Sequence, residues 1–211
     1  ECQRFIDKMD ARMDAEGTDT LGITHRNKRY FVSNCFREQP SLRTFLFSDL
    51  MADICRATLG DTAYLFWEQY VVKGADEGFS FSWHQDSAYY GLDPHDVITL
   101  WLAFTNSSPA NGCVRILPRT HLGEEFVHNE TYAADNLLAR GQSIEGLDDS
   151  NAVDLELAAG QFSMHHERMV HGSAPNAGAW DEMASDPVTP RWNAYMAEVL
   201  ETDENGYIIF H

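Results

Sequence analysis

The sequence has few basic residues for its length. Its 211 residues include 15 Lys and Arg against 33 Asp and Glu, which gives a formal net charge of −18. A field of this sign repels nucleic acids and anionic membranes, so we expect neither as a partner. It also makes a bulky polyanion, such as a coenzyme A thioester, a less natural substrate. Solubility or adaptation to salty surroundings would explain the same charge, and these explanations stay open.

Long apolar runs and paired cysteines are also missing. No stretch approaches the ~20 apolar residues of a membrane-spanning helix, and no charged and then apolar leader stands at the start. The four cysteines, Cys2, Cys35, Cys55 and Cys113, are widely spaced and form no CxxC motif. We therefore expect reduced thiols and a cytoplasmic protein. The sequence leaves the oligomeric state open.

What the sequence does have is the composition of a globular domain. Hydrophobic residues make up 44% and aromatic residues 12% of the chain, and its length allows one domain with a sizeable core. No internal repeat or linker divides it. We expect a single domain over residues 1–211, with a helical part over about residues 1–60 and a β-rich core over about residues 63–211.

The first sixty residues are expected to contain helices. Residues 2–13 have apolar residues at helical spacing, with Gly17 as a stop. Ser41 is expected to cap a second helix that runs to residue 59 and carries one apolar stripe. Residues 24–36, first basic and then aromatic, are expected to form a loop or an irregular strand.

From residue 63 onward the pattern changes to short strands rich in aromatic and β-branched residues. Residues 97–105 are apolar on both faces and therefore central. The polar segment over residues 123–154 is long for a loop and suggests a lid or binding segment. This order predicts a jelly roll, mainly β with flanking α-helices, in which two sheets enclose a cavity. The strands are expected at residues 64–72, 79–86, 97–105, 113–117, 154–157, 161–165, 170–172 and 191–200, with a last one at 208–210.

The segment around His84 carries the first candidate metal ligands. Side chains two residues apart on an extended strand point to the same face, so His84 and Asp86 would aim at one point. With a second His they would form the 2-His-1-carboxylate triad, which holds Fe(II) and leaves coordination positions open. A His-x-Asp pair alone is also common among solvated surface residues.

The best candidate for the third ligand is His171. It lies in a short apolar strand followed by Gly172, and in a jelly roll this late strand can lie opposite residues 83–86. His165 and His166 alternate to opposite faces of a strand, and we expect His166 to be packed or to support a ligand. The remaining histidines lie in polar loops or at the end of the chain: His25, His95, His121, His128 and His211.

Four segments in this order resemble the phytanoyl-CoA dioxygenase family, which comprises Fe(II)- and 2-oxoglutarate-dependent oxygenases on a double-stranded β-helix. The segments are residues 83–86 (WHQD), 98–104, 111–121 and 166–176, and the resemblance covers about residues 41–200. It implies that His84, Asp86 and His171 hold Fe(II) and that O2 is a co-reactant.

The resemblance also implies a 2-oxoglutarate site. Trp101 is similar to the aromatic residue that flanks the cosubstrate, and we expect Thr99 in the same site. Ser173 is similar to the hydroxyl that binds the distal carboxylate, which the family pairs with an Arg. Arg191 is the candidate, because a guanidinium can grip a carboxylate with two parallel hydrogen bonds. It lies farther from His171 than is usual in the family.

The expected reaction is hydroxylation of a C–H bond of a small polar metabolite, with release of succinate and CO2. Related halogenases have a small residue in place of the carboxylate, so Asp86 favours hydroxylation over halogenation. Desaturation, epimerisation and cyclisation use the same ligand set and stay open. A cupin-like protein that binds metal or ligand without oxidation is an alternative from another class.

The substrate is the least determined part of this interpretation. Aromatic residues near the iron motif and the negative charge would suit a quaternary ammonium group through cation–π contact, although the same aromatics can be core. Small bacterial relatives act on amino-acid derivatives and phosphonates, and Arg115, Arg119 or residues 26–29 could bind an anionic group. The candidate substrate residues are Tyr89, Tyr90, Trp83, Gln69 and Tyr70.

Overall fold

The computed structural model describes residues 2–16, 30–75, 78–131, 133–138, 142–177 and 191–201. The predicted stop at Gly17, the basic residues 26–29 and the strand at 208–210 lie outside the described residues. No helix in the described ranges combines the length and apolar character needed to cross a membrane. The four cysteines, all in these ranges, are free.

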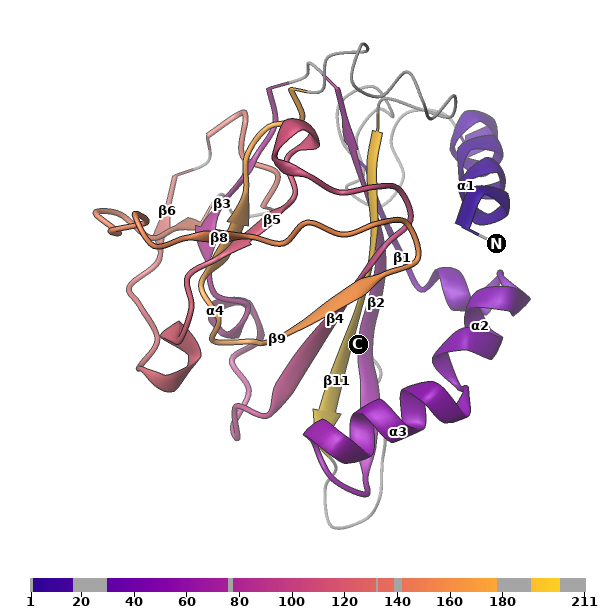
Figure 1. Ribbon diagram of the computed structural model, residues 1–211, viewed down its shortest axis with the longest axis horizontal. Helices are drawn as coiled ribbons and strands as arrows, with labels where there is room; N and C mark the ends of the chain where they lie inside the picture. The colour runs from indigo at the N-terminus through magenta and orange to yellow at the C-terminus, as the bar shows by residue number, and fades with distance from the viewer. Residues whose placement is uncertain are drawn as a thin grey trace.

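Two antiparallel sheets form the core of the molecule, and the predicted jelly roll is confirmed (Figure 1). The larger sheet has the order β1-β2-β11-β4-β9, from β1 (Tyr30–Ser33), β2 (Ala63–Gly74), β11 (Arg191–Glu201), β4 (Val97–Ala103) and β9 (Phe162–His166). The smaller sheet has the order β3-β10-β5-β8, from β3 (Phe81–His84), β10 (His171–Ser173), β5 (Val114–Ile116) and β8 (Val153–Asp154). The polar segment contributes a short pair, β6 (Asn129–Glu130) with β7 (Gln142–Ser143).

Two helices stand where the sequence predicts one. Helix α2 (Pro40–Leu46) ends before Ser48, whose hydroxyl accepts a hydrogen bond from the Met51 N–H and caps α3 (Asp49–Thr58). The prediction that Ser41 caps the first of them is wrong, because Gln39 is the N-cap. Pro40 then occupies the first turn, where the missing N–H of proline costs nothing. The chain also contains α1 (Cys2–Glu16), α4 (Ser87–Tyr90) and the 3-10 helices η1 (Cys35–Arg37), η2 (Pro109–Asn111) and η3 (Thr120–Leu122).

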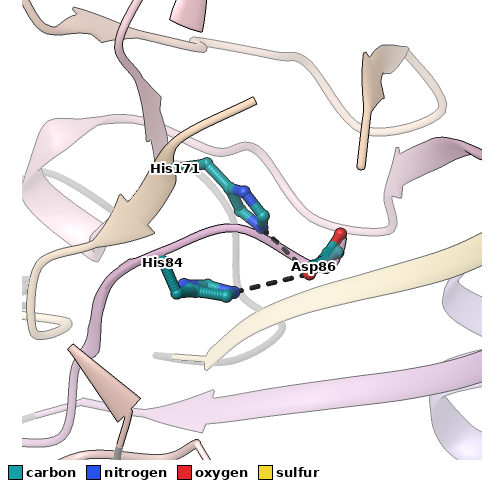
Figure 2. A group of neighbouring side chains, drawn as sticks. All are labelled: His84, Asp86 and His171. Atoms are coloured by element: carbon teal, nitrogen blue, oxygen red, sulfur yellow. Dashed lines mark ion pairs between the residues drawn. The ribbon is translucent and has the colours of Figure 1, made fainter. Parts of the chain in front are cut away.

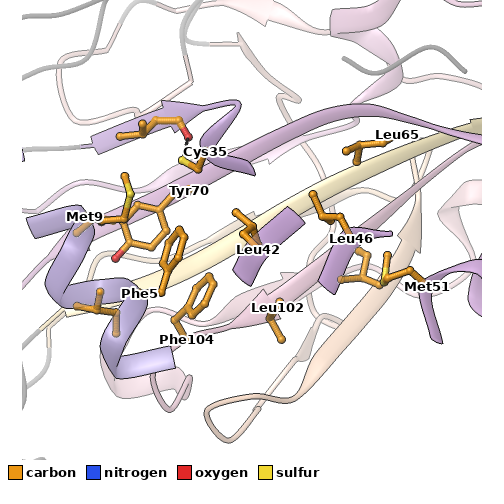
Figure 3. Packing of buried hydrophobic residues seen from close by; sticks show 14 residues of the cluster. Phe5, Met9, Cys35, Leu42, Leu46, Met51, Leu65, Tyr70, Leu102 and Phe104 are labelled. Carbon is orange, nitrogen blue, oxygen red and sulfur yellow. Dashed lines mark hydrogen bonds between the residues drawn. The ribbon is translucent and has the colours of Figure 1, made fainter. Parts of the chain in front are cut away.

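Helices α1, α2 and α3 cover one face of the larger sheet, and the smaller sheet lies on its other side (Figure 1). Under the helices, Phe5 stacks on Phe104 with ring centroids 4.9 Å apart and meets the edge of Tyr70 at 5.2 Å (Figure 3). Tyr70 and Phe104 face the helices. Because side chains alternate along a strand, their neighbours in the sequence face the smaller sheet. Val71, Trp101 and Ala103 accordingly pack against Val114. The space between the sheets is where the candidate ligands converge.

Candidate metal centre

His84 and His171 come from neighbouring strands of the smaller sheet. The antiparallel register of β3 and β10 sets them directly opposite each other, with ring centroids 4.2 Å apart. Gly172 allows this close pairing, because a Cβ at that position would lie 2.9 Å from the Phe81 carbonyl oxygen. Both histidines are buried.

Asp86 reaches the same point by a turn of the chain. Strand β3 ends at His84, and Asp86 has helical backbone angles (φ −63°, ψ −33°) at the start of α4. The expectation that both ligands extend from one strand is therefore corrected. Gln85, fully buried between them, fixes the turn: its side chain donates to the Arg168 carbonyl at 2.8 Å and accepts from the Phe126 N–H at 2.7 Å.

The three side chains point toward one another (Figure 2). Asp86 Oδ1 lies 3.6 Å from His84 Nε2 and 3.6 Å from His171 Nε2. One ligand atom from each residue lies within 4.8 Å of the other two. The predicted third ligand thus lies beside the His-x-Asp pair.

Hydrogen bonds to the backbone determine which ring nitrogens face the centre. His84 Nδ1 lies 2.8 Å from the Ser82 carbonyl oxygen, and His171 Nδ1 lies 2.8 Å from the Met169 carbonyl oxygen. A carbonyl oxygen only accepts, so each Nδ1 carries the proton and each Nε2 presents a lone pair to Asp86. Metal-binding histidines are commonly oriented by such a bond from the other ring nitrogen.

The charges of the triad suit a divalent metal ion. Burial lowers the pKa of His171 to about 3, and nearby His84 adds to this effect. Burial alone would raise the pKa of Asp86, but His171 and His84 outweigh it and hold that pKa well below its usual range. At neutral pH the centre therefore offers an uncharged imidazole from His171 and a carboxylate from Asp86. Two imidazoles and one carboxylate fit Fe(II), with positions left open for other molecules.

His165 is the further histidine beside this centre. Its Nε2 lies 3.9 Å from Asp86 Oδ2, and its buried ring has no hydrogen-bond partner among the described residues. It stands opposite Thr99 in the register of β4 and β9, and Thr99 Oγ1 donates to the same Asp86 oxygen at 3.1 Å. The prediction assigned this supporting place to His166, which instead accepts the Arg168 N–H at 3.1 Å. The sequence predicted that His165 and His166 point to opposite faces of their strand, but it did not predict that His165 is the one that faces the centre.

Two of the predicted cosubstrate residues, Trp101 and Ser173, lie between the sheets, beyond Thr99. Trp101 is buried there, two residues along β4. Ser173, two residues after His171, donates a 2.7 Å hydrogen bond to the Gly112 carbonyl and accepts one from Lys73. Arg191 begins β11 in register with Gly74, and its role as the carboxylate-binding residue stays a prediction.

Two of the candidate substrate residues lie away from the metal centre. Tyr70 is fully buried under the helices against Phe5 and Phe104, on the far face of the larger sheet, so its assignment is corrected. Trp83 precedes His84 on β3 and points to the opposite face, where its Nε1 donates to Asp149 at 3.2 Å. Its assignment is corrected for the same reason: alternation turns it away from the ligands.

The other three candidates occupy different places. Tyr90 packs its ring against that of Phe66, with centroids 5.1 Å apart, in a cluster with Tyr64 and Val97. The ring of Tyr89 lies 6.0 Å from that of His84. Gln69 shares a row of the larger sheet with Trp101, because both pair with Met196. Tyr89 and Gln69 are therefore the candidates that stay near the site.

Lys73 is a residue that the sequence analysis missed. It is fully buried near the end of β2 and donates a hydrogen bond to Ser173 Oγ. The available signal was a lysine inside the apolar run Tyr-Val-Val-Lys, where a charged residue is unusual.

Known proteins resemble this chain in sequence over much of its length. The phytanoyl-CoA dioxygenase (PhyH) family matches residues 1–181. Over 131 residues the chain is 31% identical to the probable alpha-ketoglutarate-dependent hypophosphite dioxygenase of Stutzerimonas stutzeri, which covers 61% of this chain and 46% of that protein. Over 167 residues it is 23% identical to the phytanoyl-CoA dioxygenase of Arabidopsis thaliana. That alignment covers 78% of this chain and 54% of the relative. The chain thus spans about half the length of these relatives.

Solved structures share the fold. The non-heme monooxygenase ThoJ superposes with a TM-score of 0.69 at 24% identity, over 95% of this chain and 66% of that one. EvdO2 from Micromonospora carbonacea var. aurantiaca, complexed with 2-oxoglutarate, gives a TM-score of 0.68 at 21% identity, over 95% and 82%. The carbocyclase SnoK gives 0.69 at 19% identity, over 96% and 76%. The match over residues 1–181, together with this jelly roll, shows that the chain belongs to the phytanoyl-CoA dioxygenase family.

Proposed function

We propose that this protein is an Fe(II)- and 2-oxoglutarate-dependent dioxygenase that hydroxylates a C–H bond of a small polar metabolite. The observation that carries the proposal is the buried triad, in which two Nε2 lone pairs and one carboxylate oxygen face one another. Membership of the family supports 2-oxoglutarate as the cosubstrate. When bound, the iron would use 2-oxoglutarate and O2 to oxidise the substrate, with succinate and CO2 as coproducts.

The residues of the chain prepare the site for this reaction. His84, Asp86 and His171 would hold the ion in a buried place, where little water competes for the open positions. Thr99 fixes the carboxylate by donating to Asp86 Oδ2 at 3.1 Å. We assign Ser173 to the distal carboxylate of the cosubstrate, together with Arg191.

One of the two named relatives supports a small substrate. The Stutzerimonas stutzeri relative is named for hypophosphite, a small phosphorus oxyanion. We therefore rank phosphonates and related phosphorus acids first among the candidate substrates, ahead of quaternary-ammonium and amino-acid-derived compounds. Tyr89, whose ring lies 6.0 Å from that of His84, is our candidate substrate contact.

A different oxidative outcome is the second candidate function. The structural neighbours include the epimerase SnoN, with a TM-score of 0.67 at 15% identity, and the carbocyclase SnoK. These names motivate epimerisation and cyclisation as alternatives on the same three ligands. A cupin-like binding protein would hold metal or ligand without consuming O2.

A substrate screen tests these possibilities together. The purified protein is supplied with Fe(II), 2-oxoglutarate, O2 and one candidate compound at a time, and succinate release is measured. For each compound that gives succinate, the mass of the product is determined by mass spectrometry. A gain of one oxygen is the expected result. An unchanged mass with altered stereochemistry means epimerisation, and a loss of two hydrogens means desaturation or cyclisation. Metal binding without any succinate release supports the binding protein instead.

A further inference from the structure

Lys73 connects the larger sheet to two segments beside the metal centre. Its buried ammonium donates hydrogen bonds to Ser173 Oγ and to the Ala174 carbonyl, at the end of β10. It also donates to the Gly112 carbonyl, just after η2, at 2.9 Å. The Lys73 carbonyl in turn accepts from Asn176 Nδ2 at 3.1 Å. One residue of β2 therefore holds the end of β10 in place.

Burying a lysine ammonium in this position costs free energy, so the presence of Lys73 there needs an explanation. Burial lowers the pKa of Lys73 to about 7, which reflects the cost of removing an ammonium from water. An apolar side chain of similar length would fill the same volume without this cost. An apolar side chain would not supply the hydrogen bonds to Ser173 Oγ and to the Gly112 and Ala174 carbonyls.

The hydroxyl of Ser173 already has both a donor and an acceptor. Its oxygen accepts from Lys73, and its proton goes to the Gly112 carbonyl at 2.7 Å. That carbonyl also receives a hydrogen bond from Lys73. If the Ser173 proton turned to a bound anion, the Gly112 carbonyl would keep its bond from Lys73, and no buried carbonyl would lose its last partner.

The position of Ser173 suits the far end of a metal-bound dicarboxylate. Ser173 and His171 are two residues apart on β10, so they share a face and lie roughly 7 Å apart along the strand. A 2-oxo acid bound at the centre through its first two carbons would direct its remaining chain away from the metal. Arg191 begins β11 in register with Gly74, next to Lys73, so its backbone starts at the same end of the site.

We propose that Lys73 is a positioning residue for the cosubstrate: it holds the oxygen of Ser173 and leaves the hydroxyl proton available to the distal carboxylate of 2-oxoglutarate. The bond from Lys73 also polarises the hydroxyl and makes it a stronger donor, because linked hydrogen bonds reinforce one another. This inference rests on the proposed function, since it needs 2-oxoglutarate to bind.

The test compares two 2-oxo acids on the whole chain loaded with Ni(II), which binds the cosubstrate without turnover. Affinities for 2-oxoglutarate and for pyruvate, which lacks the distal carboxylate, are measured by isothermal titration calorimetry. We expect Lys73→Met to weaken 2-oxoglutarate binding roughly tenfold and pyruvate binding by less than about twofold. In the Ser173→Ala background, Lys73→Met should add almost nothing, because Lys73 acts through Ser173.

The control variant is Glu68→Gln. Glu68 is also fully buried on β2, but it lies on the helix-covered face, where it accepts the Phe36 N–H at 3.1 Å. It should bind both acids as the wild type does. If Lys73→Met does not fold, as judged by thermal unfolding, Lys73→Gln replaces it and should show the same selectivity with a smaller loss.

Three results would overturn the inference: equal weakening of both acids, additive losses in the double variant, or unchanged 2-oxoglutarate binding by Lys73→Met. The first of these would mean that Lys73 only supports the fold. Failure of the proposed function has a different signature, because the wild type itself would then bind no 2-oxoglutarate, and this inference would fall with it.

Discussion

Thr99 on β4 donates a 3.1 Å hydrogen bond to Asp86 Oδ2, whereas the other carboxylate oxygen, Oδ1, is the one near His84 and His171. The bond joins the larger sheet to the turn that follows β3. It leaves Oδ1 directed at His84 and His171. The orientation of the carboxylate therefore depends on a residue of the opposite sheet.

Thr99→Val should weaken metal binding without unfolding the protein. Loss of a hydrogen bond that orients a metal ligand typically lowers affinity by about 10- to 100-fold. Thr99→Ser keeps the hydroxyl and should bind metal nearly as the wild type does. Titration with Fe(II) in the absence of O2 measures both affinities. Equal affinities for Thr99→Val and the wild type would contradict this role.

Substitutions of the two adjacent histidines should change stability in opposite directions. His165 buries a ring without a partner among the described residues, so His165→Leu should raise the free energy of unfolding of the metal-free protein by about 1–2 kcal/mol. His166 accepts the Arg168 N–H, so His166→Leu should lower it by about 1 kcal/mol. Urea unfolding measures both values. A loss of stability in His165→Leu would show that its ring has a structural partner.

Glu68 should make stability fall between mildly acidic and neutral pH. Burial raises its pKa from 4.5 to about 7. The folded state binds this proton more tightly, so the contribution is fully present below pH 4.5 and is lost as the pH rises to about 7. Glu68→Gln should flatten this part of the curve and raise the free energy of unfolding at pH 8 by roughly 2–3 kcal/mol.

Urea unfolding of this variant at pH 5 and pH 8 checks the prediction about Glu68. The exposed Asp53 supplies the control, because Asp53→Asn should leave the difference between the two pH values as it is in the wild type. A Glu68→Gln protein with the wild-type pH dependence would mean that other groups cause it.

Alanine substitutions at two glycines with nearly the same φ angle distinguish the cost of backbone strain from the cost of steric clashes. Gly78 has φ +72°, and a Cβ there would meet no atom of the described residues within 4 Å. A Cβ on Gly112, at φ +71°, would collide with the Ala174 carbonyl and with Lys73 Nζ. Gly78→Ala should cost about 1 kcal/mol from the left-handed conformation alone. Gly112→Ala should cost at least about 3 kcal/mol, because backbone atoms cannot move aside easily. Similar losses in urea unfolding would show that the contact at Gly112 relaxes.

The sequence predicted that His84, Asp86 and His171 come together, but not the way they meet. His84 and His171 were expected on facing strands, and the register confirms this. Asp86 was expected on the same strand as His84, whereas it lies after the strand has ended. The turn is held by hydrogen bonds between the Gln85 side chain and segments far along the chain, and alternation alone does not reveal such contacts.

Residues whose roles depend on distant partners were harder to predict. His165 and His166 look alike in sequence, and which one faces inward is decided by the pairing of β9 with β4. Lys73 gains its role from Ser173, which is 100 residues away. The break between α2 and α3 was a local feature and was missed because the apolar stripe continues across Ser48.

The most direct test of the central claim is Fe(II)-dependent conversion of 2-oxoglutarate to succinate by the wild type and by Asp86→Ala. The wild type should release succinate only when Fe(II) is present. Asp86→Ala should lose this activity while its circular dichroism stays native, and Asp61→Ala, which removes an exposed carboxylate outside the triad, should keep it. Full succinate release by Asp86→Ala would contradict the assignment of His84, Asp86 and His171 as the metal centre.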